Sequence, residues 1–327
     1  MNTTPNRLTQ GVLEYTSLLL FVAVLALFSA LSPKFLSLEN AVNILVQSAP
    51  TGVAAVGMTF VLLTAGVDLS VGAIMFLTGA IGGSMLLAGH PLALALLVML
   101  AGGVAFGAIN ALFITRLNVA PFIVTLALLF VGRGLALTIT QTRAMNLPET
   151  FLQLGTARIL GVPIILWVLG LVAVAAQLVL SRTPFGRHIY AVGNNPKNAL
   201  KAGLRPARIL SAVYVISGLC AALGGILSLT QLGAVSPKFG EAYEFKAIAA
   251  AVLGGTSLFG GRGAVLPGTL LGAVLIQSIE SGLVILNADP YLYPIITAAI
   301  IFIAVLIDSA RHQLLARLTR RRIRSEP

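Results

Sequence analysis

Apolar residues along the chain fall into ten runs, separated by short stretches rich in charge, proline or glycine. Most runs come close to the roughly 20 residues that an α-helix needs to cross a bilayer, and the eighth is shorter. We therefore expect an all-α polytopic membrane protein, a single transmembrane domain over 1–327 with about ten helices in one bundle. The expected spans are 15–31, 41–64, 69–88, 91–114, 120–140, 163–180, 209–230, 247–259, 264–285 and 293–307.

Composition supports the membrane assignment. Hydrophobic residues make up 57% of the chain and charged residues 9%, and the mean hydropathy is +0.98. Soluble domains carry about 25% charged residues, so an ordinary water-soluble enzyme is excluded. The one cysteine, Cys220, cannot form an intrachain disulfide, and it leaves the redox compartment open.

The basic residues indicate how the chain crosses the membrane. The net charge of +11 would suggest nucleic acid in a soluble chain, but here we expect no nucleic-acid partner. With the N-terminus in the cytoplasm, 15 of the 21 basic residues fall on the inner side and 5 on the outer side. The positive-inside rule therefore predicts that both termini are cytoplasmic, in a bacterial plasma (inner) membrane. The thin positive region before the first span favours an uncleaved helix over a signal peptide.

Two cytoplasmic segments stand out in this topology. Residues 309–327 form a basic tail, which fits either an amphipathic helix on anionic lipid or a solvated segment. Residues 181–208 form the longest loop, and within it Asn195, Pro196 and Gly203 suit the N-cap, first position and stop of a two-turn helix. A loop of this length is more often functional than a mere connector.

Several kinds of chemistry are missing. The spans contain no pair of carboxylates at one depth, which disfavours a proton- or sodium-coupled carrier. The sequence has no Walker A motif and no Cys/His cluster with metal spacing. We expect no catalytic residue, cofactor or metal, so that any ATP would be bound by a partner subunit.

Polar side chains inside the spans are the candidates for a passage. Polar groups in lipid are costly, so they should face a cavity or a neighbouring helix. We expect Asp68 to lie in a very short inner turn between the second and third spans and to cap backbone groups there. A weak similarity between residues 63–72 and 253–261 suggests a second, related hairpin. The candidates for the pathway are Asn43, Gln47, Thr59, Ser70, Gln277, Glu280 and Ser281.

Four segments resemble one known family. They are Val-Gly-Met-Thr at 56–59 with Gly-Val-Asp-Leu-Ser-Val-Gly at 66–72, Asn-Val-Ala-Pro-Phe-Ile-Val-Thr-Leu at 118–126 with Gly-Arg-Gly at 132–134, Thr-Pro-Phe-Gly-Arg at 183–187 with Ala-Val-Gly-Asn-Asn-Pro at 191–196, and Leu-Gly-Gly-Thr-Ser at 253–257 with Gly-Gly at 260–261. Together they resemble the ribose/xylose/arabinose/galactose permease family of ABC importers, over roughly residues 40–308. Asn194 or Asn195 stands where the family typically has an acidic residue.

The resemblance implies a function and a set of partners. Such proteins are membrane-spanning permease subunits of ATP-driven, binding-protein-dependent importers of monosaccharides. It implies two ABC ATPase subunits below, an extracytoplasmic sugar-binding protein above, and a second permease copy or a paralogue beside this chain. Branched-chain amino acid or other small-solute permeases are the alternative, followed by a stand-alone secondary carrier. The particular sugar cannot be read from the sequence.

The resemblance also assigns residues. The signature hairpin consists of Gly66, Asp68, Leu69, Ser70 and Gly72, and a direct contact of Asp68 with sugar is the alternative to its structural role. The helix in the long loop resembles the coupling helix that fits a cleft in the ATPase, with Lys197 and Lys201 on one face and Asn198, Ala199 and Ala202 on the close-packing side. The candidate coupling residues are Asn195, Pro196, Lys197, Asn198, Ala199, Leu200, Lys201, Ala202 and Gly203.

Overall fold

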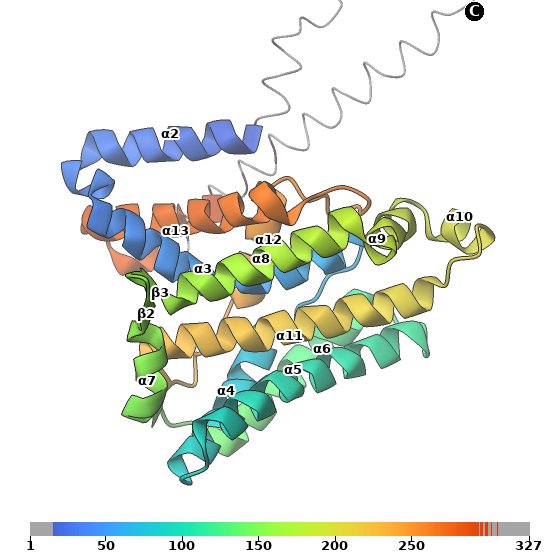
Figure 1. Ribbon diagram of the computed structural model, residues 1–327, viewed down its shortest axis with the longest axis horizontal. Coiled ribbons are helices and arrows are strands. Elements are labelled where there is room, and N and C mark those ends of the chain that lie inside the picture. The colour runs from blue at the N-terminus through green and yellow to red at the C-terminus, as the bar shows by residue number, and fades with distance from the viewer. Residues whose placement is uncertain (1–15, 294, 297, 300–301, 303–305, 307–327) are drawn as a thin grey trace, which may run out of the picture.

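The computed structural model describes residues 16–293, 295–296, 298–299, 302 and 306. This part is a bundle of long helices that run roughly side by side (Figure 1). The predicted tail 309–327 and most of the predicted span 293–307 lie outside the described residues. The principal helices are α2 (Thr16–Leu31), α3 (Leu38–Leu63), α4 (Val71–Leu87), α5 (Leu92–Thr115), α6 (Pro121–Thr140), α8 (Ile164–Arg182), α11 (Pro206–Leu232), α12 (Tyr243–Leu253) and α13 (Leu270–Ile285).

Shorter elements connect these helices. At one end of the bundle lie α7 (Glu149–Thr156) and two small antiparallel pairs, β1 (Met145–Asn146) with β4 (Ala234–Val235) and β2 (Arg158–Ile159) with β3 (Val162–Pro163). At the other end lie α9 (Pro184–Asn194) and α10 (Pro196–Lys201). The remaining elements are the short 3₁₀ helices η1 (Pro33–Leu36) and η3 (Pro290–Leu292), and the π-helical turn η2 (Val265–Thr269) that leads into α13.

Local sequence explains where several helices begin and end. Proline occupies the first turn of α6, α9, α10 and α11, where its missing N–H is not needed and its fixed φ suits the helix. Gly233 ends α11 with φ +75°, a left-handed conformation that glycine adopts without steric cost.

Six helices are long and apolar enough to cross a membrane: α3, α5, α6, α8, α11, and η2 together with α13. Two shorter apolar helices, α2 and α4, accompany them. The predicted eighth span, 247–259, is wrong in extent: α12 starts earlier, at Tyr243, and ends at Leu253, where two glycines begin a loop. The described residues therefore establish a mostly helical multi-pass architecture but do not confirm a count of ten.

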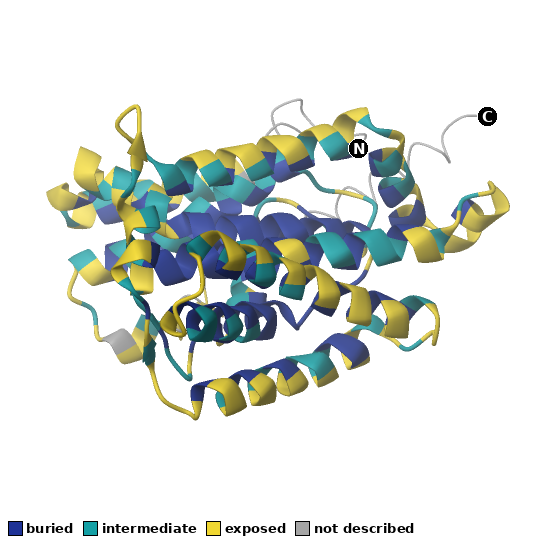
Figure 2. Ribbon diagram, turned by 60° about the horizontal axis from the view of Figure 1, so that its bottom comes forward, coloured by how far each residue is buried: buried dark blue, intermediate teal, exposed yellow. Residues whose placement is uncertain are grey.

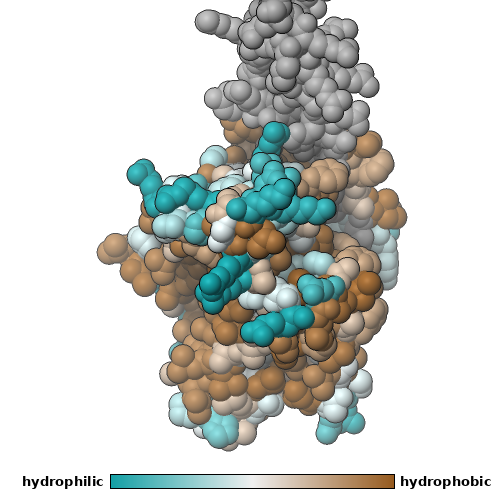
Figure 3. Space-filling model, turned by 90° about the vertical axis from the view of Figure 1, so that its right-hand side faces the viewer, coloured by the Kyte–Doolittle hydropathy of each residue, from teal (hydrophilic) through white to brown (hydrophobic). Residues whose placement is uncertain are grey.

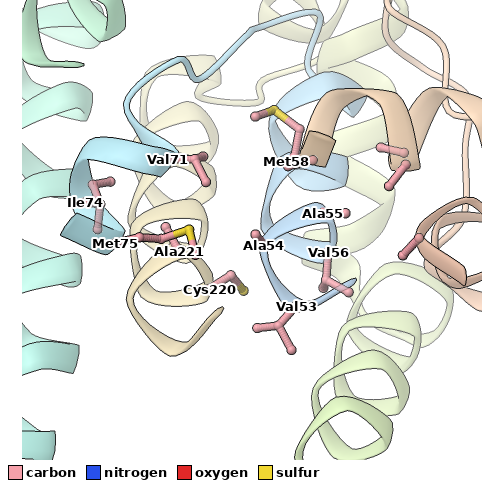
Figure 4. Close-up of a cluster of buried hydrophobic side chains, with 14 of the residues drawn as sticks. Val53, Ala54, Ala55, Val56, Met58, Val71, Ile74, Met75, Cys220 and Ala221 are labelled. Carbon is pink, nitrogen blue, oxygen red and sulfur yellow. The ribbon is translucent and has the colours of Figure 1, made fainter. Parts of the chain in front are cut away.

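The core surrounds α3. Buried residues fill the middle of the bundle, whereas the outer helices carry exposed residues on their outward faces (Figure 2). Small residues bring α3 and α11 close together, and a Cβ on Gly57 would lie 2.7 Å from the Cβ of Cys220. Side chains of α3, α4 and α11, including Val53, Met75 and Ala221, gather around this contact (Figure 4). Since lipid offers no hydrophobic driving force between helices, such close packing is what holds them together.

Candidate translocation pathway and coupling surface

Polar side chains of α3, α12 and α13 form a seam near the start of α3. The Gln277 Nε2 donates to Gln47 Oε1 at 2.9 Å, and the Ser281 Oγ donates to Asn40 Oδ1 at 2.7 Å. The Lys246 Nζ lies 2.7 Å from Glu280 Oε1. We call Asn40, Asn43, Gln47, Lys246, Gln277, Glu280 and Ser281 the α3–α13 seam.

The seam unites five of the seven pathway candidates from the sequence. Asn43 and Gln47 are exposed, whereas Gln277, Glu280 and Ser281 are half-buried. Exposed polar side chains on apolar helices would be costly in lipid, so this face is suited to an aqueous cavity or a neighbouring subunit. Sequence reasoning missed Asn40 and Lys246, because both were placed in loops just outside the expected spans.

The other two candidates, Thr59 and Ser70, lie elsewhere, in the packed interior. The Thr59 Oγ1 donates to the Ala55 carbonyl at 2.8 Å and lies 2.7 Å from Thr269 Oγ1. Both Thr59 and Ser70 are fully buried. In this conformation they join helices rather than line an open passage.

Asp68 is the centre of a buried polar network. Its Oδ1 accepts hydrogen bonds from the Ser70 N–H at 3.0 Å and the Ser70 hydroxyl at 2.6 Å. Its Oδ2 accepts one from the Ser217 hydroxyl at 2.7 Å, and the Asn110 Nδ2 donates to Ser70 Oγ at 2.8 Å. The network thus joins the non-helical segment 64–70 to α5 and α11.

This position corrects the expected location of Asp68. The segment between α3 and α4 is not a tight turn at the inner surface, and Asp68 has no exposed area. Ser217 lies near the middle of α11, so Asp68 sits deep among the helices. The reason is that α4 begins only at Val71, after a non-helical stretch that returns into the bundle.

The signature glycines permit close backbone approaches. A Cβ on Gly66 would lie 2.7 Å from the Tyr214 hydroxyl, and a Cβ on Gly72 would overlap the carbonyl of Gly240. Glu244, in the first turn of α12, packs beside Gly72, and the structure places this acid in the interior rather than in a loop. Leu69, the remaining signature residue, is also buried.

The half-buried Arg133 of α6 contacts an aromatic ring and a backbone carbonyl rather than an acidic side chain. Its guanidinium lies 5.6 Å from the centre of the Phe76 ring, and its Nη2 donates to the Pro237 carbonyl at 3.5 Å.

Among the described residues, no group of three or more His, Cys, Asp and Glu side chains could hold a metal ion.

The predicted helix in the long loop is confirmed as α10. The Asn195 Oδ1 accepts from the Asn198 N–H at 3.0 Å, Pro196 occupies the first helical position, and Gly203 follows the helix with φ +84°. The expected close-packing face of Asn198, Ala199 and Ala202 is not one continuous surface. Ala199 is only 5% exposed and packs into its own chain, whereas Asn198 and Ala202 are exposed.

The outward surface of α10 combines one apolar side chain with positive charge. Leu200 is 62% exposed between the exposed Lys197 and Lys201. Hydrophilic side chains gather on this end of the molecule, between apolar flanks (Figure 3). In the part of the chain that the structure describes, none of the basic residues here forms an ion pair. The further exposed cations of this end are Arg116, Arg182, Arg187, Arg205, Arg208 and Arg262.

Comparison with known proteins places this arrangement in a family. A family model described as branched-chain amino acid transport system / permease component matches residues 40–305. No solved structure was found to match the chain.

Three curated relatives match over nearly their whole length. The ribose import permease protein RbsC of Haemophilus influenzae is 37% identical over 303 residues, which cover 91% of this chain and 94% of the relative. The Bacillus subtilis RbsC is 41% identical over 292 residues, covering 88% and 90%. The D-allose transport system permease protein AlsC of Escherichia coli is 35% identical over 299 residues, covering 90% and 91%. The chain therefore belongs to this family of transport-system permease components, and it has the transport role and the multi-pass membrane architecture of a permease rather than a catalytic role.

Proposed function

We propose that the protein is the membrane-spanning permease subunit of an ATP-driven importer of monosaccharides of the ribose type. The observation that carries this proposal is the identity of 37–41% to ribose import permeases over about 90% of both chains. The family model is described for branched-chain amino acids, but the relatives reported above transport ribose or allose by name. This difference favours a sugar over the amino acid alternative.

The proposed complex contains more than this chain. A second permease copy or a paralogue completes the membrane part, two ABC ATPase subunits bind on the cytoplasmic side, and a sugar-binding protein delivers substrate from outside. Both termini lie in the cytoplasm of a bacterium, and we expect α2, α4, α12 and the span predicted at 293–307 to bring the six long helices to ten crossings of the plasma membrane. ATP is bound and hydrolysed by the partner subunits, because the permease sequence contains no Walker A motif.

Within this complex we assign two sites. The α3–α13 seam lines the outer part of the pathway, where amide and carboxylate groups can exchange hydrogen bonds with sugar hydroxyls. The exposed face of α10, with Leu200 between two lysines, docks on the ATPase. Ala199 supports that face from behind instead of forming part of it.

Reconstitution tests the function. Proteoliposomes that contain this chain with its partner ABC ATPase, supplied with the partner sugar-binding protein, should accumulate labelled ribose or a close monosaccharide in the presence of ATP. A panel of sugars and branched-chain amino acids supplies the comparison. Uptake of leucine or valine without uptake of any sugar would reject the sugar assignment, and uptake without an ATPase subunit would indicate a secondary carrier.

The seam predicts a transport defect without loss of assembly. Replacing Gln47 and Gln277 together with alanine should lower sugar uptake about fivefold or more, because two polar groups that face the pathway are lost. ATPase co-purification should be unchanged. The matched control is Gln153→Ala, which removes an exposed glutamine of α7, away from the seam. Normal uptake by the double variant would show that the seam does not line the pathway.

A further inference from the structure

Helix α9 contacts two segments that are far apart in the sequence, the end of α3 at Leu63 and the loop 254–264. The Tyr190 hydroxyl of α9 donates to the carbonyl of Gly263 at 2.8 Å. Desolvation raises the pKa of this hydroxyl above its ordinary value, so it stays protonated and can donate. Tyr190 therefore fastens α9 to the loop 254–264, which joins α12 to η2 and α13.

The next turn of α9 meets the end of α3. Gly193 touches the Leu63 carbonyl so closely that a Cβ on Gly193 would overlap it. The same carbonyl accepts a hydrogen bond from the Gly261 N–H at 2.9 Å. A Cβ on Gly260 would lie 2.7 Å from the carbonyl of Gly193 and 3.0 Å from Ala65. Three segments thus meet backbone against backbone, with no side chain between them that could adjust by changing rotamer.

We name this contact the α9 junction and define it by Leu63, Tyr190, Gly193, Gly260, Gly261 and Gly263. On one side, α9 continues through Asn195 directly into α10. The other two sides lead to the two short helices of the interior. Residues 64–70 lead from Leu63 to Asp68 and then into α4, and residues 254–264 lead back to α12.

The start of α4 also meets the segment just before α12. Gly72, in the first turn of α4, lies against the carbonyl of Gly240, just before α12 begins at Tyr243. Asp68 fixes the same region to the middle of α11 through Ser217. A displacement of the α9 junction therefore reaches α12 at its C-terminal end through residues 254–264 and at its N-terminal end through the start of α4.

We propose that the α9 junction passes the movement of α10 to α4 and α12 together, with Tyr190 and Gly193 as the positioning residues; this inference rests on the proposed function of α10 as the docking helix. Backbone contacts of this kind resist sliding, because packed interfaces move between discrete arrangements rather than deforming continuously. Neither residue touches substrate or nucleotide. They act by keeping α9 and the two inner loops in one rigid body.

The decisive variant is Tyr190→Phe, which removes one hydrogen bond and keeps the ring that packs in the junction. In the reconstituted complex, ATPase co-purification and basal ATP hydrolysis should be unchanged. The stimulation of hydrolysis by sugar-loaded binding protein should fall about fivefold, the factor expected when one hydrogen bond worth about 1 kcal/mol is lost. The thermal stability of the purified permease should change little, which separates loss of coupling from loss of fold.

A second variant tests the glycine. Gly193→Ala should reduce stimulated hydrolysis and uptake more strongly than Tyr190→Phe, since the added Cβ separates α9 from α3. Gly170→Ala is the matched control, because no heavy atom lies within 4 Å of a Cβ at that position of α8. If Gly193→Ala does not accumulate in the membrane, the result with Tyr190→Phe alone tests the role of the α9 junction.

The outcomes separate this inference from the proposed function. Wild-type stimulation in Tyr190→Phe overturns the inference, and so does loss of ATPase co-purification, because Tyr190 would then support docking itself. If the wild-type complex shows no sugar-stimulated hydrolysis, the proposed function fails instead, and the variants are not needed to show it.

Discussion

Replacing Leu200 with aspartate is expected to detach the ATPase from the purified permease while the permease itself stays folded in the membrane. Leu200 is 62% exposed on α10, so the substitution removes little packing within the chain. In a docked complex the same side chain would be an apolar anchor beside the two exposed lysines, Lys197 and Lys201. Losing such an anchor costs about 2 kcal/mol or more, which weakens association about thirtyfold or more.

Co-purification from detergent extracts measures this effect. The matched control is Leu160→Asp, because Leu160 is 90% exposed in the turn between β2 and β3, at the opposite end of the bundle. The control should retain the ATPase. Equal retention by both variants would show that α10 is not the docking helix.

Ala199→Glu should behave differently from Leu200→Asp. Ala199 is buried against its own chain, so a charge there has no water and no partner. Its effect would therefore combine misfolding with loss of docking, which makes Leu200 the cleaner probe of this surface.

Removing the carboxylate of Asp68 should destabilise the permease strongly. In Asp68→Ala, the Ser70 N–H and the hydroxyls of Ser70 and Ser217 all lose their acceptor. Each buried donor left without an acceptor costs about 1–3 kcal/mol, so a loss of about 3 kcal/mol or more is expected. The amount of folded permease and its thermal midpoint in detergent should both fall.

Asp289 provides a control with the same local geometry. Its Oδ1 accepts from the Tyr291 N–H at 2.9 Å, as Asp68 does from Ser70, but Asp289 is exposed. Asp289→Ala should leave the midpoint nearly unchanged. Asp68→Asn tests the remaining alternative: normal stability and ATPase coupling with altered sugar affinity would make Asp68 a substrate contact instead.

The membrane helices were predictable because their signals are local. Run length, proline at the first turn and the Asn195 cap all act within a few neighbouring residues, and they located α10 to within about one residue. The start of α12 was missed, because Tyr243 to Lys246 include charged residues that hydropathy assigns to a loop.

The surroundings of the site residues could not be predicted in the same way. Asp68 is held by Ser217, which is 149 positions away, and Gln47 is paired with Gln277, which is 230 positions away. No periodicity in a single sequence encodes such pairings. The inward direction of Ala199 likewise depends on how a six-residue helix sits on the rest of the bundle.

The central position of α3 has a consequence for how the protein is made. Its neighbours α11, α12 and α13 are synthesised only after more than a hundred further residues, so α3 enters the membrane before they exist. Among the six long helices it has the lowest mean hydropathy, 1.5. Its polar side chains therefore raise the free energy of α3 in lipid while its neighbouring helices are absent. The Ser48 and Thr59 hydroxyls, however, donate to carbonyls of their own helix, at Leu45 and Ala55. These internal bonds need no partner helix, so both hydroxyls have an acceptor in the bilayer before the later helices arrive.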